Sequence, residues 1–421
     1  MLLLIDFSKA FDTVSHDILL DKLLHYGIRG NAHKWFQSYL SDRYQYVTIN
    51  GKYSTTKYIK HGVPQGSILG PLLFIIYIND IPSISSIARF ILYADDANII
   101  ISGTSMSDIE SQFNDLVNVL MSWVSGNELI LNIKKTHYMI FSRNRNLDLE
   151  GFTPKINNVP IEKKNVVKFL GVLVDDRLTW RQHIAAVKAK MSRHIGIMYK
   201  LRSVLPLAAR LQIFNSLVQS HVSYCTLVWG SSCKNNIDTL FTTQKKAMRS
   251  VIPGFVNYYY KDGLLPTHTK SAFNEYNVLT VYNIILKNML IYVHKILHMS
   301  SSVPLYVQQT LAPNIPIPGN PPDNHYDWYT QYNSIPLNRT TFFKAPLLYY
   351  QIVSDNLKLN YFFNHNNVLS IYKGAVQRYL VGVQSAGDPN EWHNSNHKLI
   401  APVGLRQSQR LIQQNIRSQQ N

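Results

Sequence analysis

Apolar and polar positions along the first 180 residues follow two patterns. Short apolar runs favour strands, and they lie at 2–5, 90–93, 98–101 and 138–141. Apolar side chains three or four positions apart favour helices over 69–78 and 105–125, a helix from Ser15 to a stop at Gly27, and another after Asn31. Segments 44–50 and 53–59 flank Asn50-Gly51, a pair typical of a type I′ hairpin turn. Strands and helices in this mixed order predict an α+β fold.

The pattern becomes helical after residue 180. One apolar stripe at steps of three and four consists of Ile184, Val187, Met191, Ile195, Met198 and Leu201. We interpret this stripe as core and not as a partner surface, and we expect further helices over 207–220 and 237–252. The later part of the chain contains a Pro- and Asn-rich segment at 313–338 and a basic, Gln-rich tail at 405–421.

Two adjacent acids, Asp95 and Asp96, lie between the apolar runs 90–93 and 98–101. This arrangement predicts a hairpin with its acids at the tip. Taken alone, such a pair is more often a solvated turn, because Asp is a common turn former. A third acid, Asp6, follows the run 2–5, whose unbroken hydrophobicity suits a strand buried on both faces. Three carboxylates at neighbouring strand ends favour a hard divalent cation, Mg²⁺ before Mn²⁺.

Five ordered segments carry a resemblance to a known family. They are 6–14 (DFSKAFDTV), 61–71 (HGVPQGSILGP), 93–96 (YADD), 131–136 (LNIKKT) and 167–172 (VKFLGV). In this order they resemble the palm motifs of reverse transcriptases. The last segment runs into 175–180 (DDRLTW), a pattern similar to the polymerases of non-LTR (LINE-like) retrotransposons. A group II intron maturase is a weaker alternative, because it shares the Asp pair and the Pro-Gln-Gly loop but not the region around Trp180.

The resemblance implies a right-hand polymerase fold. We expect an antiparallel palm over 1–175, a basic helical thumb-like region over 176–255, a helical connector over 256–312, the linker 313–338, a small helical subdomain over 339–404 and the tail 405–421. Members of the family carry fingers before the first palm acid, whereas Asp6 is close to the first residue here. We therefore expect an N-terminally truncated chain with its fingers largely missing and its activity impaired.

The function implied is an RNA-directed DNA polymerase that adds deoxynucleotides to the 3′-hydroxyl of a DNA primer on an RNA template. Asp6, Asp95 and Asp96 would hold two Mg²⁺ ions, and Lys135 would protonate the leaving pyrophosphate, a role for which Lys134 is the alternative. The implied substrate contacts are Phe11, Gly62, Gln65, Gly66, Tyr93 and Ala94. Phe11 would exclude a ribose 2′-hydroxyl, unless it is only a core residue. Gln65 would contact a base or a sugar, unless it only stabilises its loop.

Charge supports a polyanionic partner. Lys and Arg number 42 against 25 Asp and Glu, a net charge of +17. Asp238 is the only acid between Asp176 and Asp262, while bases are frequent there. Candidate nucleic-acid contacts are Lys188, Arg193, Lys200 and Arg202. A solvated helix face is the alternative, although such faces normally mix both signs. A non-catalytic, nucleic-acid-binding remnant therefore stays open as a second function.

Cysteine content and hydropathy indicate the compartment. Two cysteines, Cys225 and Cys233, cannot form a disulfide framework or a zinc site alone, so we expect a reducing compartment. The longest apolar run, 71–78, is too short to span a bilayer. We expect an intracellular protein without membrane contact, in a nuclear or cytoplasmic ribonucleoprotein.

Overall fold

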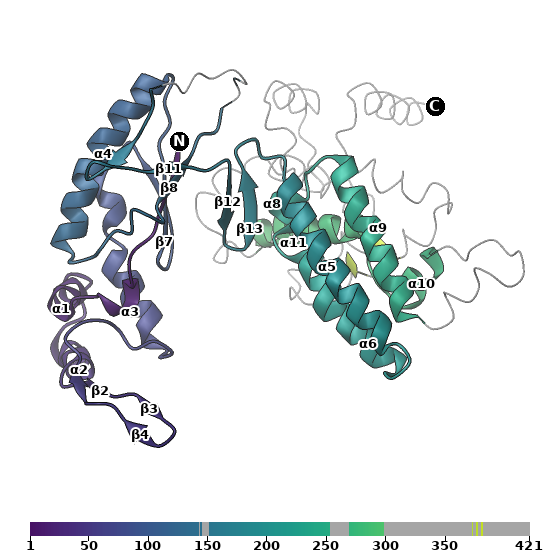
Figure 1. Cartoon of the computed structure of the whole chain (residues 1–421), viewed down its shortest axis with the longest axis horizontal. Coiled ribbons are helices and arrows are strands. Elements are labelled where there is room, and N and C mark those ends of the chain that lie inside the picture. Colours follow the sequence, from purple (N-terminus) through teal and green to yellow (C-terminus); the bar gives the residue numbers. More distant parts are fainter. Residues whose placement is uncertain are drawn as a thin grey trace, which may run out of the picture. The chain divides into compact units, whose positions relative to one another are not determined.

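The computed structural model describes residues 1–142, 144, 151–252, 269–298, 373, 376, 377, 380 and 381. The chain divides into two compact units (Figure 1). The first comprises Met1–Lys168 and Asp175–Leu178, and the second comprises Phe169–Val174 and Thr179–Asn421. Each unit has a hydrophobic cluster of its own.

A five-stranded sheet forms the centre of the first unit, in the order β11-β8-β1-β7-β6. Its strands are β1 (Leu2–Ile5), β6 (Arg89–Tyr93), β7 (Asp96–Ile100), β8 (His137–Met139) and β11 (Glu162–Lys163). Leu3 and Ile5 of β1 are buried, whereas Leu2 and Leu4 are partly exposed. The strand expected to be buried on both faces is therefore fully covered on only one.

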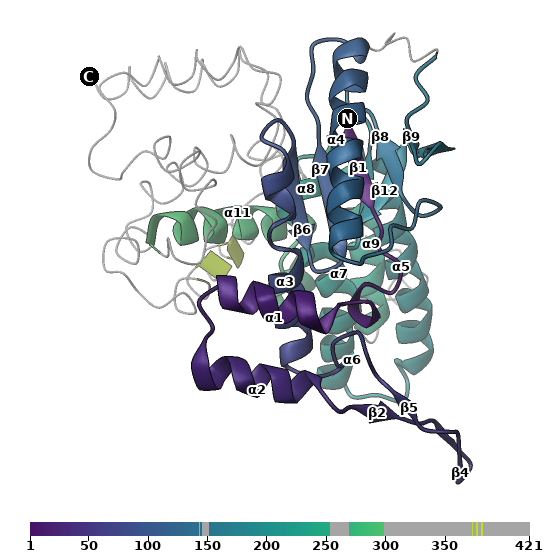
Figure 2. The same ribbon diagram turned by 90° about the vertical axis from the view of Figure 1, so that its left-hand side faces the viewer.

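Helices supply the rest of this core. They are α1 (His16–His25), α2 (Gly30–Leu40), α3 (Leu69–Ile78) and α4 (Met106–Gly126), with 3₁₀ turns η1 (Ala10–Asp12) and η2 (Ile81–Ile84) (Figures 1 and 2). All four predicted helices of this region are confirmed. The buried face of α4 presents Phe113, Leu116 and Leu120 to the cluster that contains Leu3 and Ile5. The predicted α+β fold, a central sheet packed with helices, is confirmed at this level.

The predicted hairpin around Asn50-Gly51 is present as a broken ribbon. Its strands are β2 (Tyr44–Gln45), β3 (Thr48–Ile49), β4 (Lys52–Tyr53) and β5 (Lys57–Tyr58), with β2 paired to β5 and β3 to β4. Asn50 and Gly51 have φ values of 49° and 77°, as a type I′ turn requires. In both ribbon views this hairpin extends beyond α2 (Figures 1 and 2). A second small ribbon joins β9 (Lys155–Ile156) to β10 (Val159–Pro160).

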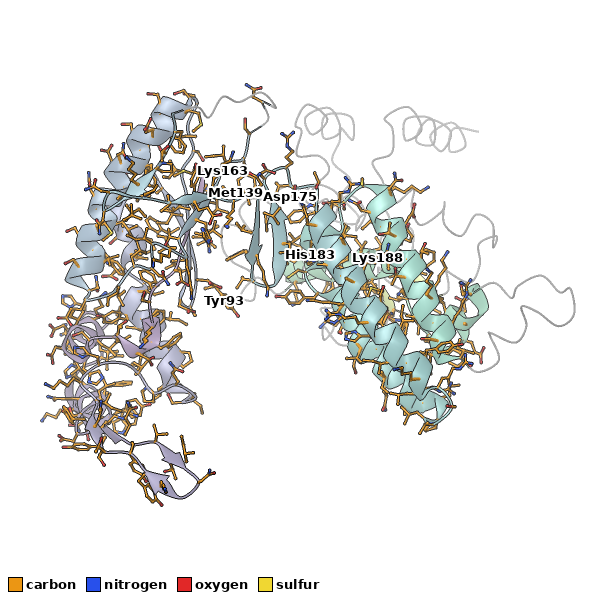
Figure 3. The ribbon with its side chains drawn as sticks, viewed as in Figure 1. Tyr93, Met139, Lys163, Asp175, His183 and Lys188 are labelled. Carbon is orange, nitrogen blue, oxygen red and sulfur yellow. The ribbon has the colours of Figure 1, made fainter. Side chains whose placement is uncertain are left out.

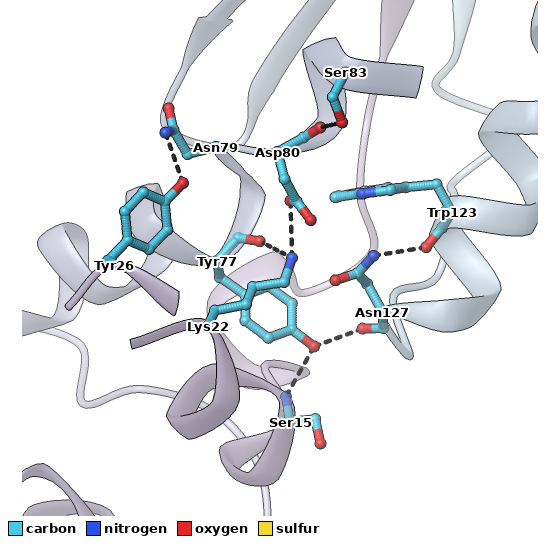
Figure 4. A network of polar contacts seen from close by, with 9 residues as sticks. All are labelled: Ser15, Lys22, Tyr26, Tyr77, Asn79, Asp80, Ser83, Trp123 and Asn127. Atoms are coloured by element: carbon cyan, nitrogen blue, oxygen red, sulfur yellow. Dashed lines mark hydrogen bonds and ion pairs between the residues drawn. The ribbon is translucent and has the colours of Figure 1, made fainter. Parts of the chain in front are cut away.

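A buried polar network joins α1, α3 and the end of α4 (Figure 4). The Tyr77 hydroxyl accepts a hydrogen bond from the Ser15 amide at 3.3 Å and donates one to the Asn127 carbonyl at 2.6 Å. The ammonium of Lys22 donates to the Tyr77 carbonyl at 2.5 Å and to Asp80 at 2.8 Å. The ends of a helix leave backbone N–H and C=O groups without intrahelical partners, and burying such a group unpaired costs folding free energy. The network therefore holds the start of α1 and the end of α4 in fixed positions.

The second unit is helical where it is described. Its main helices are α5 (Arg181–Leu201), α6 (Leu207–Phe214), α9 (Lys234–Val251) and α11 (Val281–His298), with the shorter α7 (Ser220–Ser223), α8 (Thr226–Trp229) and α10 (Lys270–Glu275). The stripe predicted as core on α5 is buried at Ile184, Val187, Met191 and Met198, and Ile195 packs against the same cluster. The predicted helix over 237–252 is confirmed as α9.

One predicted helix differs in type and one predicted strand was wrong in extent. The helical segment expected over 207–220 is present without a break, as α6, a π turn at Asn215–Gln219 and α7. The π turn leaves room for an outside donor, and His194 Nδ1 lies 2.8 Å from the Leu217 carbonyl oxygen. The strand expected over 138–141 ends at Met139, because its partner strand β1 begins at Leu2, directly opposite.

Strands β12 (Val166–Phe169) and β13 (Val172–Asp175) pair in a two-stranded ribbon. The chain passes from the first unit to the second after Lys168 in β12, returns after Val174 in β13, and enters the second unit again after Leu178. Helices α10 and α11 lie within the segment expected as a helical connector. The expected linker 313–338 and tail 405–421 lie outside the described residues, as does almost all of 339–404. Within the described residues, no helix combines the length and the apolar character that a membrane span requires.

Candidate active site

The two-residue turn between β6 and β7 presents the acid pair. Tyr93 pairs with Asp96 across the hairpin, which leaves Ala94 and Asp95 as the turn. Ala94 has a φ of 49°, a left-handed conformation that costs a non-glycine residue about 1 kcal/mol or more. Backbone strain of this kind is concentrated at functional sites. The Tyr93 side chain is 62% exposed at the end of the hairpin (Figure 3).

The register of β1 against β7 brings the third acid to the pair. Ile5 lies opposite Ala97, so the next residue, Asp6, continues the register opposite Asp96. Alternation along both strands puts these two acids on the same face of the sheet. Burial raises the pKa of Asp96, and the neighbouring charges of Asp95 and Asp6 raise it further. The three predicted acids therefore share one edge of the sheet.

The three carboxylates carry like charge, and in the described part of the chain the base that forms an ion pair with one of them, Asp6, is Lys135. Its Nζ lies 3.9 Å from Asp6 Oδ2, and its side chain is 71% exposed. In the described part of the chain, no three His, Cys, Asp or Glu side chains converge closely enough to hold a metal ion. The three acids therefore lie at the same edge of the sheet, but their side chains do not converge on a common point.

Backbone hydrogen bonds place Lys135. The amide of Asn132 donates to the Asp6 carbonyl at 2.8 Å, and the amide of Ser8 donates to the Ile130 carbonyl at 2.8 Å. A turn follows, in which the Lys135 amide donates to the Asn132 carbonyl at 3.1 Å. Segment 130–132 therefore extends the pairing beyond Asp6 and turns Lys135 back toward it. Lys134 is exposed and does not line the cavity described next, so the geometry favours Lys135 over Lys134.

A cavity of about 480 Å³ opens beside these residues. Its lining is drawn from the segment after β1, the 61–67 loop, the Asp turn and the turn that holds Lys135: Asp6, Phe7, Ser8, Lys9, Ala10, Phe11, Gln65, Asp95, Asn132 and Lys135. Five of the predicted site residues, Asp6, Phe11, Gln65, Asp95 and Lys135, line this cavity. A cavity of this size is within the range of ligand sites.

The loop around Gly62 is attached to the segment after Asp6. The Gly62 amide donates to the Val14 carbonyl at 2.7 Å, and the Val63 amide donates to the Phe11 carbonyl at 2.8 Å. Gly62 has a φ of 89°, and a Cβ there would lie 2.8 Å from the backbone oxygen of Asp12. Only glycine permits this close approach. Gly66 also has a positive φ, of 82°, but faces open space.

Gln65 and Phe11 each have a protein partner as well as a place at the cavity. The Gln65 side chain donates to Asp12 Oδ1 at 2.8 Å. The Phe11 ring stacks on Phe74, with 4.5 Å between centroids, and remains partly exposed. Phe11 therefore packs on the core and is still accessible from the cavity. It has the contact expected of a core residue and the exposure that a sugar-selecting ring would need.

Sequence reasoning missed several residues at the cavity. Asp12 fixes Gln65, Asn132 carries the backbone link to Asp6, and Lys9 lines the wall with a left-handed φ of 50°. All three lie inside motif segments that were recognised. The roles of Asp12 and Asn132 depend on long-range hydrogen bonds, which have no local sequence signal.

The predicted nucleic-acid contacts lie on and beside α5 in the second unit. Lys188, Arg193 and Lys200 are exposed (Lys188 is labelled in Figure 3). Arg202 is half-buried, and its guanidinium lies 4.2 Å from the ring centre of Tyr199. Helix α5 contains no acid, and its bases form no ion pair with an acid of the described residues.

Comparison with known proteins gives one family model and several similar proteins. Residues 1–174 match the family model "Reverse transcriptase (RNA-dependent DNA polymerase)". The chain is 28% identical over 257 residues to the "Probable RNA-directed DNA polymerase from transposon X-element" of Drosophila melanogaster. It is 27% identical over 257 residues to the "RNA-directed DNA polymerase from mobile element jockey" of Drosophila funebris. In both cases the match covers 59% of this chain and 28% of the relative.

A telomerase structure from Candida tropicalis is also similar, at 12% identity and a TM-score of 0.32, covering 68% of this chain and 46% of that one. This weak likeness carries no argument about the fold. The chain spans about a quarter of the length of the curated relatives that it matches. Residues 1–174 therefore match the reverse transcriptase family model, and the two relatives are named as RNA-directed DNA polymerases of a transposon and of a mobile element.

Proposed function

We propose that the chain is the polymerase part of a non-LTR retrotransposon protein and extends a DNA primer with deoxynucleotides on an RNA template. The observation that carries this proposal is the β1–β7 register, which brings Asp6 near the Asp95-Asp96 pair, together with the cavity that Asp6, Asp95 and Lys135 line. In this proposal the first unit is the palm, the basic helices of the second unit are the thumb, and the protein works in a nuclear or cytoplasmic ribonucleoprotein.

The donor set of the site fits divalent cations. Carboxylate oxygens are the ligands that Mg²⁺ prefers. Burial raises the pKa of Asp96, the charges of Asp95 and Asp6 raise it further, and a bound cation would oppose both effects. Asp6 and Asp95 would be the main ligands, and Asp96 would assist. When bound, a pair of such cations lowers the pKa of the attacking hydroxyl and neutralises the charge that develops on the phosphate.

The residues of the chain would then position a phosphoryl transfer. The primer 3′-hydroxyl attacks the α-phosphorus of the nucleotide, a new P–O bond forms, and the bond to pyrophosphate breaks. The Lys135 ammonium would give its proton to the leaving pyrophosphate, and its place beside Asp6 supports this role. Catalysis of this kind depends mainly on positioning, so the rigid backbone links of segment 130–132 serve it directly.

Two side chains would select the nucleotide. Phe11, held from below by Phe74, would present its ring to the sugar and exclude a 2′-hydroxyl. Gln65, fixed by Asp12, would hold the Gly62 to Gly66 loop close to the template and the nucleotide. Tyr93 and the tight Ala94 turn would contact the primer end. The exposed bases of α5 would bind phosphates of the nucleic acid.

Primer extension tests the proposal. Purified full-length chain, an RNA template with an annealed DNA primer, the four dNTPs and Mg²⁺ should give extended primer. Asp95→Ala should reduce incorporation by roughly a thousandfold, because charge stabilisation at the reacting centre is lost. Asp21→Ala, which changes an exposed acid on α1, is the matched control and should retain activity.

Two outcomes would overturn the assignment. Extension that is unchanged in Asp95→Ala would remove Asp95 from the site. Wild-type chain that binds the primer–template but never extends it, with Mg²⁺ or Mn²⁺, would leave a nucleic-acid-binding protein in place of a polymerase. Ribonucleotide incorporation by Phe11→Val, expected to rise at least about tenfold relative to the wild type, tests the selection step separately.

A further inference from the structure

The ribbon from Arg43 to Lys60 is unusual because its aromatic side chains have no core to cover. Every residue from 44 to 58 is exposed. Four of them are tyrosines whose side chains are 47–71% exposed, namely Tyr44, Tyr46, Tyr53 and Tyr58. A two-stranded ribbon alone is only marginally stable. So large an exposed aromatic area on a thin arm points to a partner outside the chain.

The tyrosines form two cross-strand pairs along the ribbon. The ring centres of Tyr44 and Tyr58 are 5.2 Å apart, and those of Tyr46 and Tyr53 are 5.5 Å apart. Each pair stabilises the ribbon. Because the rings remain more than about half exposed on average, each pair also offers an accessible ring face to a ligand.

The aromatic series continues onto α2. Trp35 is 53% exposed and stacks on Tyr39, with 5.5 Å between ring centres and an interplanar angle of 11°. The guanidinium of Arg43 lies 6.0 Å from the Tyr39 ring centre. Exposed rings therefore continue from α2 to the ribbon through Arg43.

The charge of the ribbon selects the kind of partner. Residues 43–60 contain Arg43, Lys52, Lys57 and Lys60 and no acid. Lysines next to exposed rings fit a ligand that carries phosphates and flat apolar faces together. Single-stranded nucleic acid has both, whereas the bases of a duplex are already stacked on each other.

We propose that residues 43–60, with Trp35 and Tyr39 of α2, form a binding surface for single-stranded RNA or DNA that stacks unpaired bases on its tyrosines and holds their phosphates on its lysines. The inference deepens the proposed function and rests on it only for the choice of a nucleic acid partner. The surface is separate from the acid cavity, since none of these residues lines it. It would hold a strand that is not paired at the reaction site.

Binding in the absence of catalysis tests this inference. Fluorescence anisotropy with the full chain, in EDTA and without nucleotides, would compare labelled single-stranded RNA, single-stranded DNA and a duplex of the same sequence. The variant Tyr44→Leu with Tyr53→Leu changes one ring of each pair and keeps apolar bulk. It should bind single strands about tenfold more weakly per lost ring, while duplex binding stays unchanged. Tyr44→Phe with Tyr53→Phe keeps the rings and should bind as the wild type does.

Two further variants keep the test decisive if the leucines disturb the ribbon. Lys52→Gln with Lys57→Gln leaves the tyrosine pairs intact and should reduce the salt dependence of single-strand binding by about 0.7 per lost phosphate contact. Tyr26→Leu changes an exposed tyrosine on the end of α1 and should bind as the wild type does.

Unchanged single-strand binding in both the leucine and the lysine variants would overturn the inference. So would an equal loss of duplex binding, or tight binding to anionic phospholipid vesicles that the oligonucleotide cannot displace. Asp95→Ala should bind like the wild type in this assay. Failure of the polymerase proposal and failure of this inference therefore give different results.

Discussion

The sheet edge of the first unit and helix α5 of the second unit each gather side chains of like charge, but of opposite sign. At the sheet edge, burial raises the pKa of Asp96, and the nearby charges of Asp95 and Asp6 raise it further. Along α5, five bases and no acid occupy 21 residues: Arg181, Lys188, Lys190, Arg193 and Lys200. Among the described residues, the acids form one ion pair, between Asp6 and Lys135 at 3.9 Å, and the bases of α5 form none.

The difference shows what each group is suited to bind. Clustered carboxylates at rigid strand ends fit small cations, which need oxygen ligands at fixed positions. Bases spaced along one exposed helix fit a long polyanion, which needs positive charge along a line more than at a point. In the proposed function, the first unit would carry the chemistry and the second unit would hold the nucleic acid.

The two units are also assembled differently. Long-range backbone pairing builds the acid site, such as Asn132 to Asp6 across more than a hundred residues. The second unit depends on apolar packing of helices, with Met191, Trp229 and Leu290 fully buried. A change in the first unit should therefore alter geometry and chemistry, whereas charge changes on α5 should alter binding and little else.

The largest expected effect is a loss of primer extension without a loss of nucleic-acid binding. Asp6→Asn keeps the size of the side chain and removes its charge. We expect primer extension to fall by roughly a thousandfold in single-turnover assays. The dissociation constant for primer–template should change by less than about threefold, since the bases of α5 are untouched. Equal losses of both would mean that the acid site and the nucleic-acid surface cannot be separated in this way.

The next effect tests the close packing between the Gly62 loop and Asp12. Gly62→Ala puts a Cβ 2.8 Å from the Asp12 carbonyl oxygen at a φ of 89°. Left-handed strain and the clash together should destabilise the first unit by about 2–4 kcal/mol. Hydrogen exchange should show faster opening at β1 and β7 amides and unchanged protection in α5 and α9.

Gly66→Ala is the matched control for this prediction. Its φ of 82° gives the same strain, but nothing lies within 4 Å of the added Cβ. It should cost only about 1 kcal/mol. Equal effects of the two alanine variants would show that strain alone, and not the approach to Asp12, makes Gly62 necessary.

A smaller effect concerns the buried network behind the site. Tyr77→Phe removes the hydroxyl that joins Ser15 and Asn127 and leaves both backbone groups without that partner. The cost should be about 1–3 kcal/mol in the unfolding of the first unit, measured by hydrogen exchange at its sheet amides. Lys22 and Asp80 keep their own hydrogen bond in this variant and serve as an internal reference.

The pH dependence of the same residue has a definite sign. Burial raises the pKa of Tyr77 to about 12, above its ordinary value of 10.0. A raised pKa means that the neutral hydroxyl is favoured by folding, so its stabilisation is complete below pH 10 and is lost as pH rises through about 12. The wild type should therefore lose stability in this alkaline range more steeply than Tyr77→Phe. Identical slopes would contradict the raised pKa.

Local pattern predicted the elements on which the site stands. The helix over 69–78 was predicted with the bounds that it has, since ten nearly continuous apolar residues leave no other choice. The Asp pair at a hairpin tip and Asp6 after a strand end were also predicted, and the structure has β6 and β7 joined at the pair and β1 ending just before Asp6. Hydrophobic runs and turn chemistry are local properties, so they are visible in the sequence.

The remaining features depend on contacts between distant residues. Nothing local indicates that Gln65 is fixed by Asp12, that Phe11 rests on Phe74, or that His194 meets the π turn at Leu217. The preference for Lys135 over Lys134 likewise required the turn that begins at Asn132. Tertiary hydrogen bonds and packing decide such cases, and two identical neighbours in a sequence cannot be separated without them.

The smallest expected effect tests the second half of the comparison. Lys188→Gln with Arg193→Gln removes two exposed charges from α5 and leaves its buried stripe intact. If each contacts a phosphate, the slope of log affinity against log salt for a primer–template duplex should fall by about 0.9 per charge. At physiological salt the affinity itself should fall only severalfold, and extension at saturating primer–template should be unchanged. An unchanged slope would assign these bases to an ordinary solvated face, because charge that faces only water releases no counterions when nucleic acid binds.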